Sequence, residues 1–235
     1  MNIALVIAGG SGTRTGNAVP KQFLTINDIP IIVYTLMNLE KTEEIDCICV
    51  GVASGWESFV QAYVKQYRIE KLTDIVQAGK SRRETIGNGI RHLARKYQDD
   101  AKVLVIDANR PMIPKDVFRR VIMATQKGEC ALAVSPCYDS MYLSCDHNVV
   151  SECVDRSVLF CGQTPECALL SDYSEVYETA NTRNFEDPPA ALFLRCNKTV
   201  RKVDGSAKSF KITTQDDIEM FKAIVSCCKI DSYEV

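Results

Sequence analysis

The chain of 235 residues lacks the segments that would carry it to or across a membrane. Its first residues, Met1-Asn2-Ile3-Ala4, are not a basic region followed by a long apolar stretch, so we expect no secretory signal. No apolar run approaches the ~18 residues that a membrane-spanning helix needs. The formal net charge of -2 lacks the basic excess typical of nucleic-acid-binding proteins. We therefore expect a cytoplasmic protein with no membrane or nucleic-acid partner.

Cysteine is plentiful, with eleven residues, but the spacings of metal and redox motifs are missing. There is no CxxC pair, and a cytoplasmic chain keeps its thiols reduced, so we expect no disulfide framework. Most of these cysteines are better interpreted as small buried hydrophobic residues. Cys137, Cys145, Cys153 and Cys161 recur every eight residues, and the sequence offers no physical reason for that spacing.

Two glycine motifs of nucleotide-binding proteins are also absent. A GxGxxG fingerprint would need a third glycine after Gly10 and Gly12, but Thr15 stands in its place. A Walker A loop would need a Gly-Lys-Ser or Gly-Lys-Thr step, and none occurs. These absences disfavour a dinucleotide-dependent dehydrogenase and a P-loop kinase.

What the chain does have is a regular alternation of predicted strands and helices. The predicted strands are 2–8, 46–52, 75–77, 102–106 and 130–135, and the predicted helices are 31–39, 56–67, 83–97 and 115–126. Strands that alternate with helices are typical of an α/β fold with a mostly parallel, twisted, Rossmann-like sheet and helices on both faces. We see no linker or repeat, and we expect one domain over residues 1–235.

The pattern changes after Pro136. Residues 139–154 are rich in short polar and β-forming residues around a turn at Asp146-His147-Asn148, which predicts a β-arm over 137–155. Because a projecting arm can bury its apolar side against a second subunit, we expect a homodimer. Helices are predicted at 171–182 and 216–228, and two short strands within 192–203.

The strongest chemical signal is the glycine-rich run Ala8–Gly16, which follows the first strand and is itself followed by Pro20-Lys21-Gln22-Phe23. Backbone N–H groups, which glycine lets approach closely, and fixed cations are well suited to hold a triphosphate. Arg14 and Lys21 supply such cations. Further polar segments, Gly79–Thr85 and Asp107–Pro111, follow later strands, at the sheet edge where α/β proteins bind ligands.

The run Ala8–Leu24 resembles the signature loop of nucleotidyltransferases with a GT-A-like fold. Its ending, Pro20–Leu24, narrows the resemblance to the polyol-phosphate cytidylyltransferases, the family of the 2-C-methyl-D-erythritol 4-phosphate and D-ribitol-5-phosphate enzymes. The other segments similar to family motifs are Gly79–Thr85, Asp107–Pro111, Gly162–Pro165 and Phe210–Thr214. The likeness covers nearly the whole chain and implies one nucleotidyltransferase domain.

The resemblance implies that the phosphate of a polyol phosphate attacks the α-phosphorus of CTP and that pyrophosphate leaves. The partners would be CTP and a small polyol phosphate, in isoprenoid biosynthesis or in teichoic acid or capsule biosynthesis. A divalent cation, usually Mg²⁺, would bridge the triphosphate. Such chemistry relies on positioning and charge neutralisation.

The resemblance also implies roles for individual residues. The implied catalytic cations are Arg14, Lys21 and Lys211. The residues implied for nucleotide binding are Ala8, Gly9, Gly10, Gly12, Gly79, Arg82, Thr85 and Asp107. Those implied for binding the acceptor substrate are Asp107, Arg110, Ser140, Arg156 and Thr164. No dedicated metal site is expected, because phosphates would hold the Mg²⁺, with Asp107 as a candidate ligand. His92 and His147 have no evident partner, and we interpret both as structural.

Departures from the family concentrate on the acceptor side. The segment Asp139–Tyr142 lacks a lysine of one branch, Glu186–Pro189 keeps only Asp187 of the usual stretch, and Glu166 replaces the usual glutamine after Thr-Pro. The remaining motifs lean toward the ribitol-phosphate branch. Two alternatives stay open: a sugar-1-phosphate nucleotidyltransferase that uses another base, and a nucleotide-binding relative without catalysis.

Overall fold

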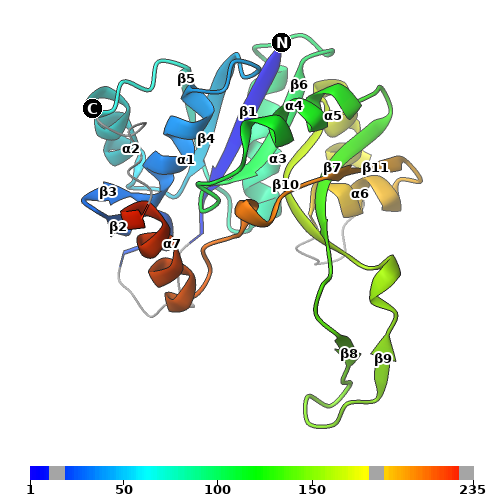
Figure 1. Ribbon diagram of the computed structural model, residues 1–235. Coiled ribbons are helices and arrows are strands. Elements are labelled where there is room, and N and C mark those ends of the chain that lie inside the picture. The colour runs from blue at the N-terminus through cyan, green and yellow to red at the C-terminus, as the bar shows by residue number, and fades with distance from the viewer. Residues whose placement is uncertain (11–18, 180–187, 228–235) are drawn as a thin grey trace.

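A seven-stranded sheet forms the centre of the computed structural model, which describes residues 1–10, 19–179 and 188–227 (Figure 1). The strand order is β11-β7-β10-β6-β1-β4-β5. The bounds are β1 Asn2–Ala8, β4 Cys47–Val52, β5 Leu72–Gln77, β6 Lys102–Asp107, β7 Glu129–Pro136, β10 Phe160–Leu169 and β11 Thr199–Asp204. Six of these strands run in one direction and β10 runs against them, so the predicted mostly parallel α/β sheet is confirmed.

Helices cover both faces of the sheet. One face carries α1 (Ile31–Glu40), α2 (Glu57–Gln66) and α4 (Lys115–Ala124), and the other carries α3 (Arg82–Ala94), α5 (Leu170–Thr179) and α6 (Pro189–Arg195). Successive side chains of a strand point to opposite faces of the sheet. Because helices cover both faces, β1 has no polar side.

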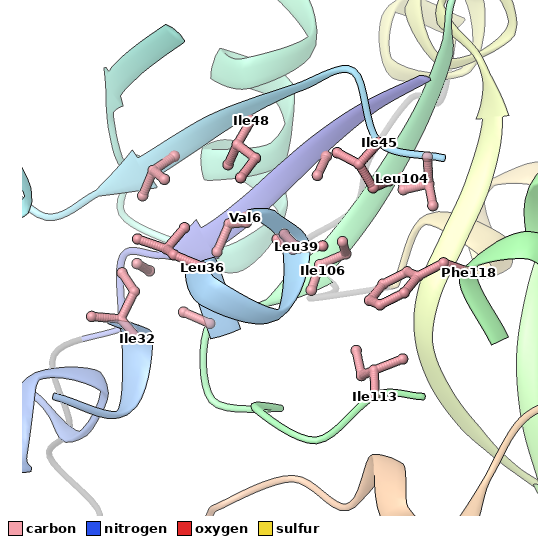
Figure 2. Packing of buried hydrophobic residues seen from close by; sticks show 14 of the residues in the cluster. Val6, Ile32, Leu36, Leu39, Ile45, Ile48, Leu104, Ile106, Ile113 and Phe118 are labelled. Atoms are coloured by element: carbon pink, nitrogen blue, oxygen red, sulfur yellow. The ribbon is translucent and has the colours of Figure 1, made fainter. Parts of the chain in front are cut away.

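Residues of β1 therefore alternate between two hydrophobic clusters. Ala4 and Val6 pack in the cluster with α1 and α4, whereas Ile3 and Leu5 pack in the cluster with α3 and α5. Figure 2 shows the first cluster, in which Val6 and other strand residues face α1. A strand buried on both faces is fixed in place, and its carboxyl end is therefore a rigid support for a site.

A third, smaller cluster brings the C-terminal helix α7 (Gln215–Cys227) against α1 and the short hairpin of β2 (Thr25–Ile26) and β3 (Ile29–Pro30). Tyr34 of α1 stacks edge-on against Phe221 of α7, and its hydroxyl donates to the carbonyl of Ile26. This packing places the segment before α7 beside the carboxyl end of the sheet.

Strand β10 was not predicted from the sequence. It returns directly from the arm rather than through a crossover helix, so it pairs antiparallel with both β6 and β7. Its register with β7 shifts between Gly162 and Glu166, and its first three residues, Phe160–Gly162, are exposed. A short, interrupted apolar pattern of this kind gives no clear strand signal.

The expectation of two short strands within 192–203 is wrong in its first half. Residues Pro189–Arg195 form α6, and only Thr199–Asp204 is a strand. Proline is favoured at the first position of a helix, where no backbone donor is lost. In this helix Leu192 and Phe193 are buried in the cluster beneath α5, so tertiary packing stabilises a helix rather than a strand.

The segment between β7 and β10 projects from the body of the molecule as an arm (Figure 1). In it, β8 (Met141–Leu143) pairs antiparallel with β9 (Glu152–Val154), followed by the 3-10 turn Arg156–Val158. The four cysteines spaced by eight all lie in the arm or its base, where the sulfurs of Cys137 and Cys161 are 3.3 Å apart. None of the described helices is long and apolar enough to cross a membrane.

Candidate active site

A cavity of about 440 Å³ opens at the carboxyl ends of β1 and β6. Its walls come from the end of β1, the turn before α3, the end of β6 and the segment before α7. The charged residues among the described lining residues are Lys21, Lys80, Arg82, Lys211 and Asp107. Four cations against one carboxylate make a cavity suited to a ligand with several negative charges.

The start of the glycine-rich loop is held by Gln22. Its side-chain amide donates to the carbonyls of Ala8, at 2.7 Å, and Gly10, at 3.0 Å. The 3-10 turn Lys21–Phe23 that carries this glutamine is itself anchored, because the ring of Phe23 stacks on Trp56 at a centroid distance of 4.0 Å. Gln22 therefore fixes the backbone at the point where β1 enters the cavity.

Gly9 is required by a close approach between β1 and α3. A Cβ at this position would lie 2.5 Å from the Cβ of Ala78 and 3.0 Å from the hydroxyl of Thr85. Side chains essentially never approach so closely, so only glycine lets the loop pass over the start of α3.

The start of α3 presents its N-terminus to the cavity. Ser81 caps the helix by accepting from the backbone N–H of Glu84 at 3.1 Å. The hydroxyl of Thr85 accepts from the N–H of Gly79 and donates to the carbonyl of Ser81, which closes the turn. Because the N-terminus of a helix carries partial positive charge, this turn adds to the attraction for anions.

Asp107, at the end of β6, is surrounded by three cations. Its carboxylate lies 3.1 Å from Arg82 Nε, 3.3 Å from Arg110 Nε and 3.1 Å from Lys211 Nζ. Burial alone would raise the pKa of Asp107, but these three charges hold it well below its usual value. Asp107 is therefore ionised at neutral pH and orients cations from three separate segments.

Two lysines line the cavity at the segment before α7: Lys211 belongs to that segment, and Lys21 contacts it. Lys21 donates from Nζ to the carbonyl of Thr213 at 2.9 Å. Asn109 donates to the carbonyl of Ile212, whose N–H donates back to the carbonyl of Asn109. This two-way link fixes the backbone beside Lys211 against the end of β6, so that Lys21 and Lys211 face the same space.

The predicted site residues divide into three groups. Those that line the cavity are Ala8, Gly9, Gly10, Lys21, Gly79, Arg82, Thr85, Asp107 and Lys211. Arg110 and Thr164 lie behind Asp107, where the Thr164 hydroxyl accepts from the backbone N–H of Asp107 at 3.4 Å. Ser140 and Arg156 lie exposed on the arm and do not line the cavity. Arg14 and Gly12 lie outside the described residues.

Sequence reasoning missed three residues that build the site. Gln22 and Asn109 were quoted only as members of motifs, and no role was predicted for them. A side-chain amide can donate to backbone carbonyls, and Gln22 follows the glycine-rich loop while Asn109 follows Asp107 at the end of a strand. Glu166 was noticed only as a departure from the family. The expectation that His92 has no partner is wrong, because its Nε2 lies 2.8 Å from Oδ1 of Asp74. Asp74 also forms an ion pair with Lys96, and this group lies on the outer surface.

A divalent cation would find few protein ligands here. Asp107 is the single carboxylate among the described residues that line the cavity, and no group of three or more acidic, histidine or cysteine side chains occurs in the described ranges. Mg²⁺ commonly binds through one or two carboxylates together with waters and substrate phosphates. The donor set fits such an ion, with Asp107 as its candidate protein ligand.

The mostly parallel sheet, the glycine loop and the cationic cavity at the strand ends define an α/β nucleotidyltransferase. The model of the IspD family, described as 2-C-methyl-D-erythritol 4-phosphate cytidylyltransferase, matches residues 2–227. The chain belongs to this family.

Relatives from both branches of the family resemble the chain over nearly its full length. Ribitol-5-phosphate cytidylyltransferase of Vibrio parahaemolyticus is 30% identical over 96% of each chain, and that of Streptococcus agalactiae serotype V is 32% identical over 95% of each. A 2-C-methyl-D-erythritol 4-phosphate cytidylyltransferase of Syntrophus aciditrophicus is 31% identical over 95% of each chain.

A solved 4-diphosphocytidyl-2C-methyl-D-erythritol synthase from Anaerococcus prevotii superposes with a TM-score of 0.80 at 22% identity, covering 96% of this chain and 98% of that one. At this identity, the likeness shows the fold.

Proposed function

We propose that this protein transfers CMP from CTP to the phosphate of a polyol phosphate and releases pyrophosphate. The observation that carries the proposal is the cavity in which Lys21, Lys80, Arg82 and Lys211 converge on the carboxyl ends of β1 and β6. An oxygen of the acceptor phosphate forms a bond to the α-phosphorus, and the bond from that phosphorus to the oxygen bridging to the β-phosphorus breaks. Pyrophosphate leaves with the bond's electron pair.

In this proposal the chain's cationic residues neutralise charge, which their positions at the cavity support. Lys21, held at Thr213, is placed to stabilise negative charge on the triphosphate and the leaving pyrophosphate, with Arg14 as its proposed companion. Lys211 pairs with Asp107, and we expect its ammonium group to leave that carboxylate and bind phosphate oxygens when the substrates are present. Preorganised charges of this kind act on the charge that develops in the transition state. A divalent cation would neutralise further phosphate charge.

We propose a ribitol-phosphate acceptor rather than methylerythritol phosphate. The motifs of this sequence carry the choice, because relatives of both branches match over 95–96% of the chain at similar identity. The product would then be a CDP-activated ribitol, of use in cell-wall or capsule polymers and made in the cytoplasm, where CTP is available.

The test measures pyrophosphate release from CTP and Mg²⁺ with ribitol 5-phosphate and methylerythritol 4-phosphate in parallel. We expect turnover with ribitol 5-phosphate, and a loss of about 10²–10³-fold in Lys21→Ala. Turnover with methylerythritol phosphate alone would reverse the acceptor assignment, and preference for UTP or GTP would overturn the assignment of the base. CTP binding without release from either acceptor would favour the non-catalytic relative.

We also propose that two copies form a homodimer in which each arm serves the other copy's cavity. Ser140 and Arg156, which family resemblance assigns to the acceptor, lie on the arm rather than at the cavity of their own chain. The arm also exposes large apolar side chains: Tyr138, Met141, Tyr142, Leu143, Val149, Val150 and Val158. Such a patch on a narrow projection favours burial against another protein surface.

Mixing two impaired variants, assayed at an acceptor concentration well below KM, tests this arrangement. Lys21→Ala disables the cavity, and Arg156→Ala leaves about a tenth of the activity by weakening the arm's hold on the acceptor phosphate. In a symmetric dimer with exchanged arms, one site of each mixed dimer has an intact cavity and an intact arm, so re-equilibrated mixtures should recover about a quarter of wild-type activity. No recovery, with dimers confirmed by sedimentation, would place each arm at its own cavity.

A further inference from the structure

Glu166 is a buried carboxylate beside the cavity that the proposed chemistry does not use. It lies on β10 and is 2% exposed. Its Oε2 accepts from the backbone N–H of Ala190, at the start of α6, at 2.8 Å. Its Oε1 lies 3.6 Å from Nη2 of Arg82. Burial raises the pKa of Glu166, and the guanidinium of Arg82 and the N–H of Ala190 act against that rise by stabilising the carboxylate.

Arg82 lies between two carboxylates. Its Nε is 3.1 Å from Asp107 Oδ1, and its Nη2 faces Glu166. The side chain is 26% exposed and lines the cavity. Because a guanidinium is planar, contacts at two of its nitrogens fix the direction of its remaining N–H donors.

We propose that Glu166 is a positioning residue of the nucleotide site, which holds the guanidinium of Arg82 in the orientation that binds CTP. This rests on the proposed function, because it takes Arg82 as a nucleotide contact. Glu166 does not itself line the cavity, so its effect reaches the ligand through Arg82. Its removal therefore weakens CTP binding and leaves the rate of the chemical step and the acceptor KM nearly unchanged.

The number of acceptor oxygens favours an acid over an amide at position 166. Two donors converge on this side chain, the N–H of Ala190 and Nη2 of Arg82. A carboxylate has acceptors for both, whereas a glutamine has one oxygen and turns an N–H toward the other donor. Glu166→Gln therefore keeps either the link to α6 or the hold on Arg82.

Asp172 provides a matched control. It is 5% exposed, accepts from the backbone N–H of Gly128 at 2.8 Å and lies 3.8 Å from Lys198. This is the same combination of a buried carboxylate, a backbone donor and a distant lysine or arginine, but none of these residues lines the cavity. Asp172→Asn therefore reproduces the structural cost of losing a buried charge without touching Arg82.

The experiment measures the Kd for CTP by calorimetry, and kcat and both KM values, for wild type, Glu166→Gln, Asp172→Asn, Arg82→Gln and the double variant Arg82→Gln/Glu166→Gln. We expect CTP binding about fivefold weaker in Glu166→Gln, with acceptor KM and kcat within about twofold, and no change in Asp172→Asn. Because Glu166 acts through Arg82, the double variant should bind CTP as Arg82→Gln does.

Additive effects in the double variant would overturn the proposal, because Glu166 would then act independently of Arg82. Equal losses in Glu166→Gln and Asp172→Asn would also overturn it, because they would mean a general loss of stability. Glu166→Asp keeps both acceptors on a shorter side chain and serves as the second variant if Glu166→Gln does not fold. We expect it to weaken CTP binding by less, and CTP binding equal to wild type would contradict the positioning role. Failure of the wild type to bind CTP would overturn the proposed function itself.

Discussion

The cavity and the arm are built in opposite ways. Three of the four described cations that line the cavity have a fixed partner: Lys21 is held by a backbone carbonyl, and Arg82 and Lys211 are held by Asp107. The arm has two strands of three residues that pair only with each other, and its large side chains are exposed. The nucleotide side is therefore preorganised within one chain, whereas the arm has the surface of a part that needs a partner.

The same contrast holds in the sequence. The motifs that match the family lie mainly where β1, α3 and β6 meet, and a change there disturbs several contacts at once. Two of the departures, Asp139–Tyr142 and Glu186–Pro189, are predicted for the acceptor side, although Glu186 and Asp187 lie outside the described residues, and the third, Glu166, lies beside the cavity. Asp139–Tyr142 is exposed on the arm, where a substitution disturbs few neighbours. The difference indicates that the acceptor side is freer to change, and the predictions below test that contrast.

The largest effect is expected from Asp107→Asn, which removes the shared partner of Arg82, Arg110 and Lys211. Breaking a buried ion pair on one side leaves cations uncompensated, so we expect a loss of about 3 kcal/mol in the free energy of unfolding at pH 7. Urea unfolding of both proteins measures this difference.

The difference should also depend on pH. The folded-state pKa of Asp107 is lowered, so its stabilisation is fully present above the unfolded pKa of about 4 and is lost as pH falls toward the folded value. The gap between wild type and Asp107→Asn should therefore be constant from about pH 5 to 7 and narrow below about pH 4. A gap that does not change with pH would mean that the asparagine acts through packing rather than charge.

The second prediction compares two adjacent glycines. A Cβ on Gly9 would meet Ala78 at 2.5 Å, whereas a Cβ on Gly10 would meet none of the described residues within 4 Å. We expect Gly9→Ala to lose about 2 kcal/mol of stability by overpacking, and Gly10→Ala to lie within about 0.5 kcal/mol of wild type. Thermal unfolding of the pair measures this. Equal losses would show that the loop, rather than its contact with α3, sets the cost.

Most strands of the sheet and most residues that line the cavity could be predicted from the sequence, because both depend on local patterns. Buried strands such as β1 are continuous apolar runs, and the polar residues that line the cavity follow their ends at the same edge of the sheet. It missed β10 because that strand is exposed at its start and pairs across a register shift. It assigned strand to part of α6 because seven residues hold too few turns for a helical period.

The sequence also could not predict which residues of the site contact one another. That Asp107 binds Arg82 is a contact over 25 positions, and that Glu166 meets both Arg82 and Ala190 depends on β10, the strand that was not predicted. No local pattern contains such pairings. Residue types can indicate which side chains do chemistry, while the residues that hold them become visible only when the strands are placed.

The smallest effect is expected on the arm, from Arg156→Ala. The side chain is exposed and donates to the carbonyl of Tyr138 within the arm, so its loss should leave the free energy of unfolding within about 0.5 kcal/mol of wild type. If the arm contributes this arginine to the acceptor phosphate, the acceptor KM should rise about tenfold, the loss expected for one charge-assisted hydrogen bond. The KM for CTP should not change, because the cavity walls are held without the arm. Steady-state kinetics with each substrate varied in turn separates the two constants. A parallel rise in the KM for CTP would show that the arm also shapes the nucleotide side, and the division between a preorganised cavity and a partner-dependent arm would then be wrong.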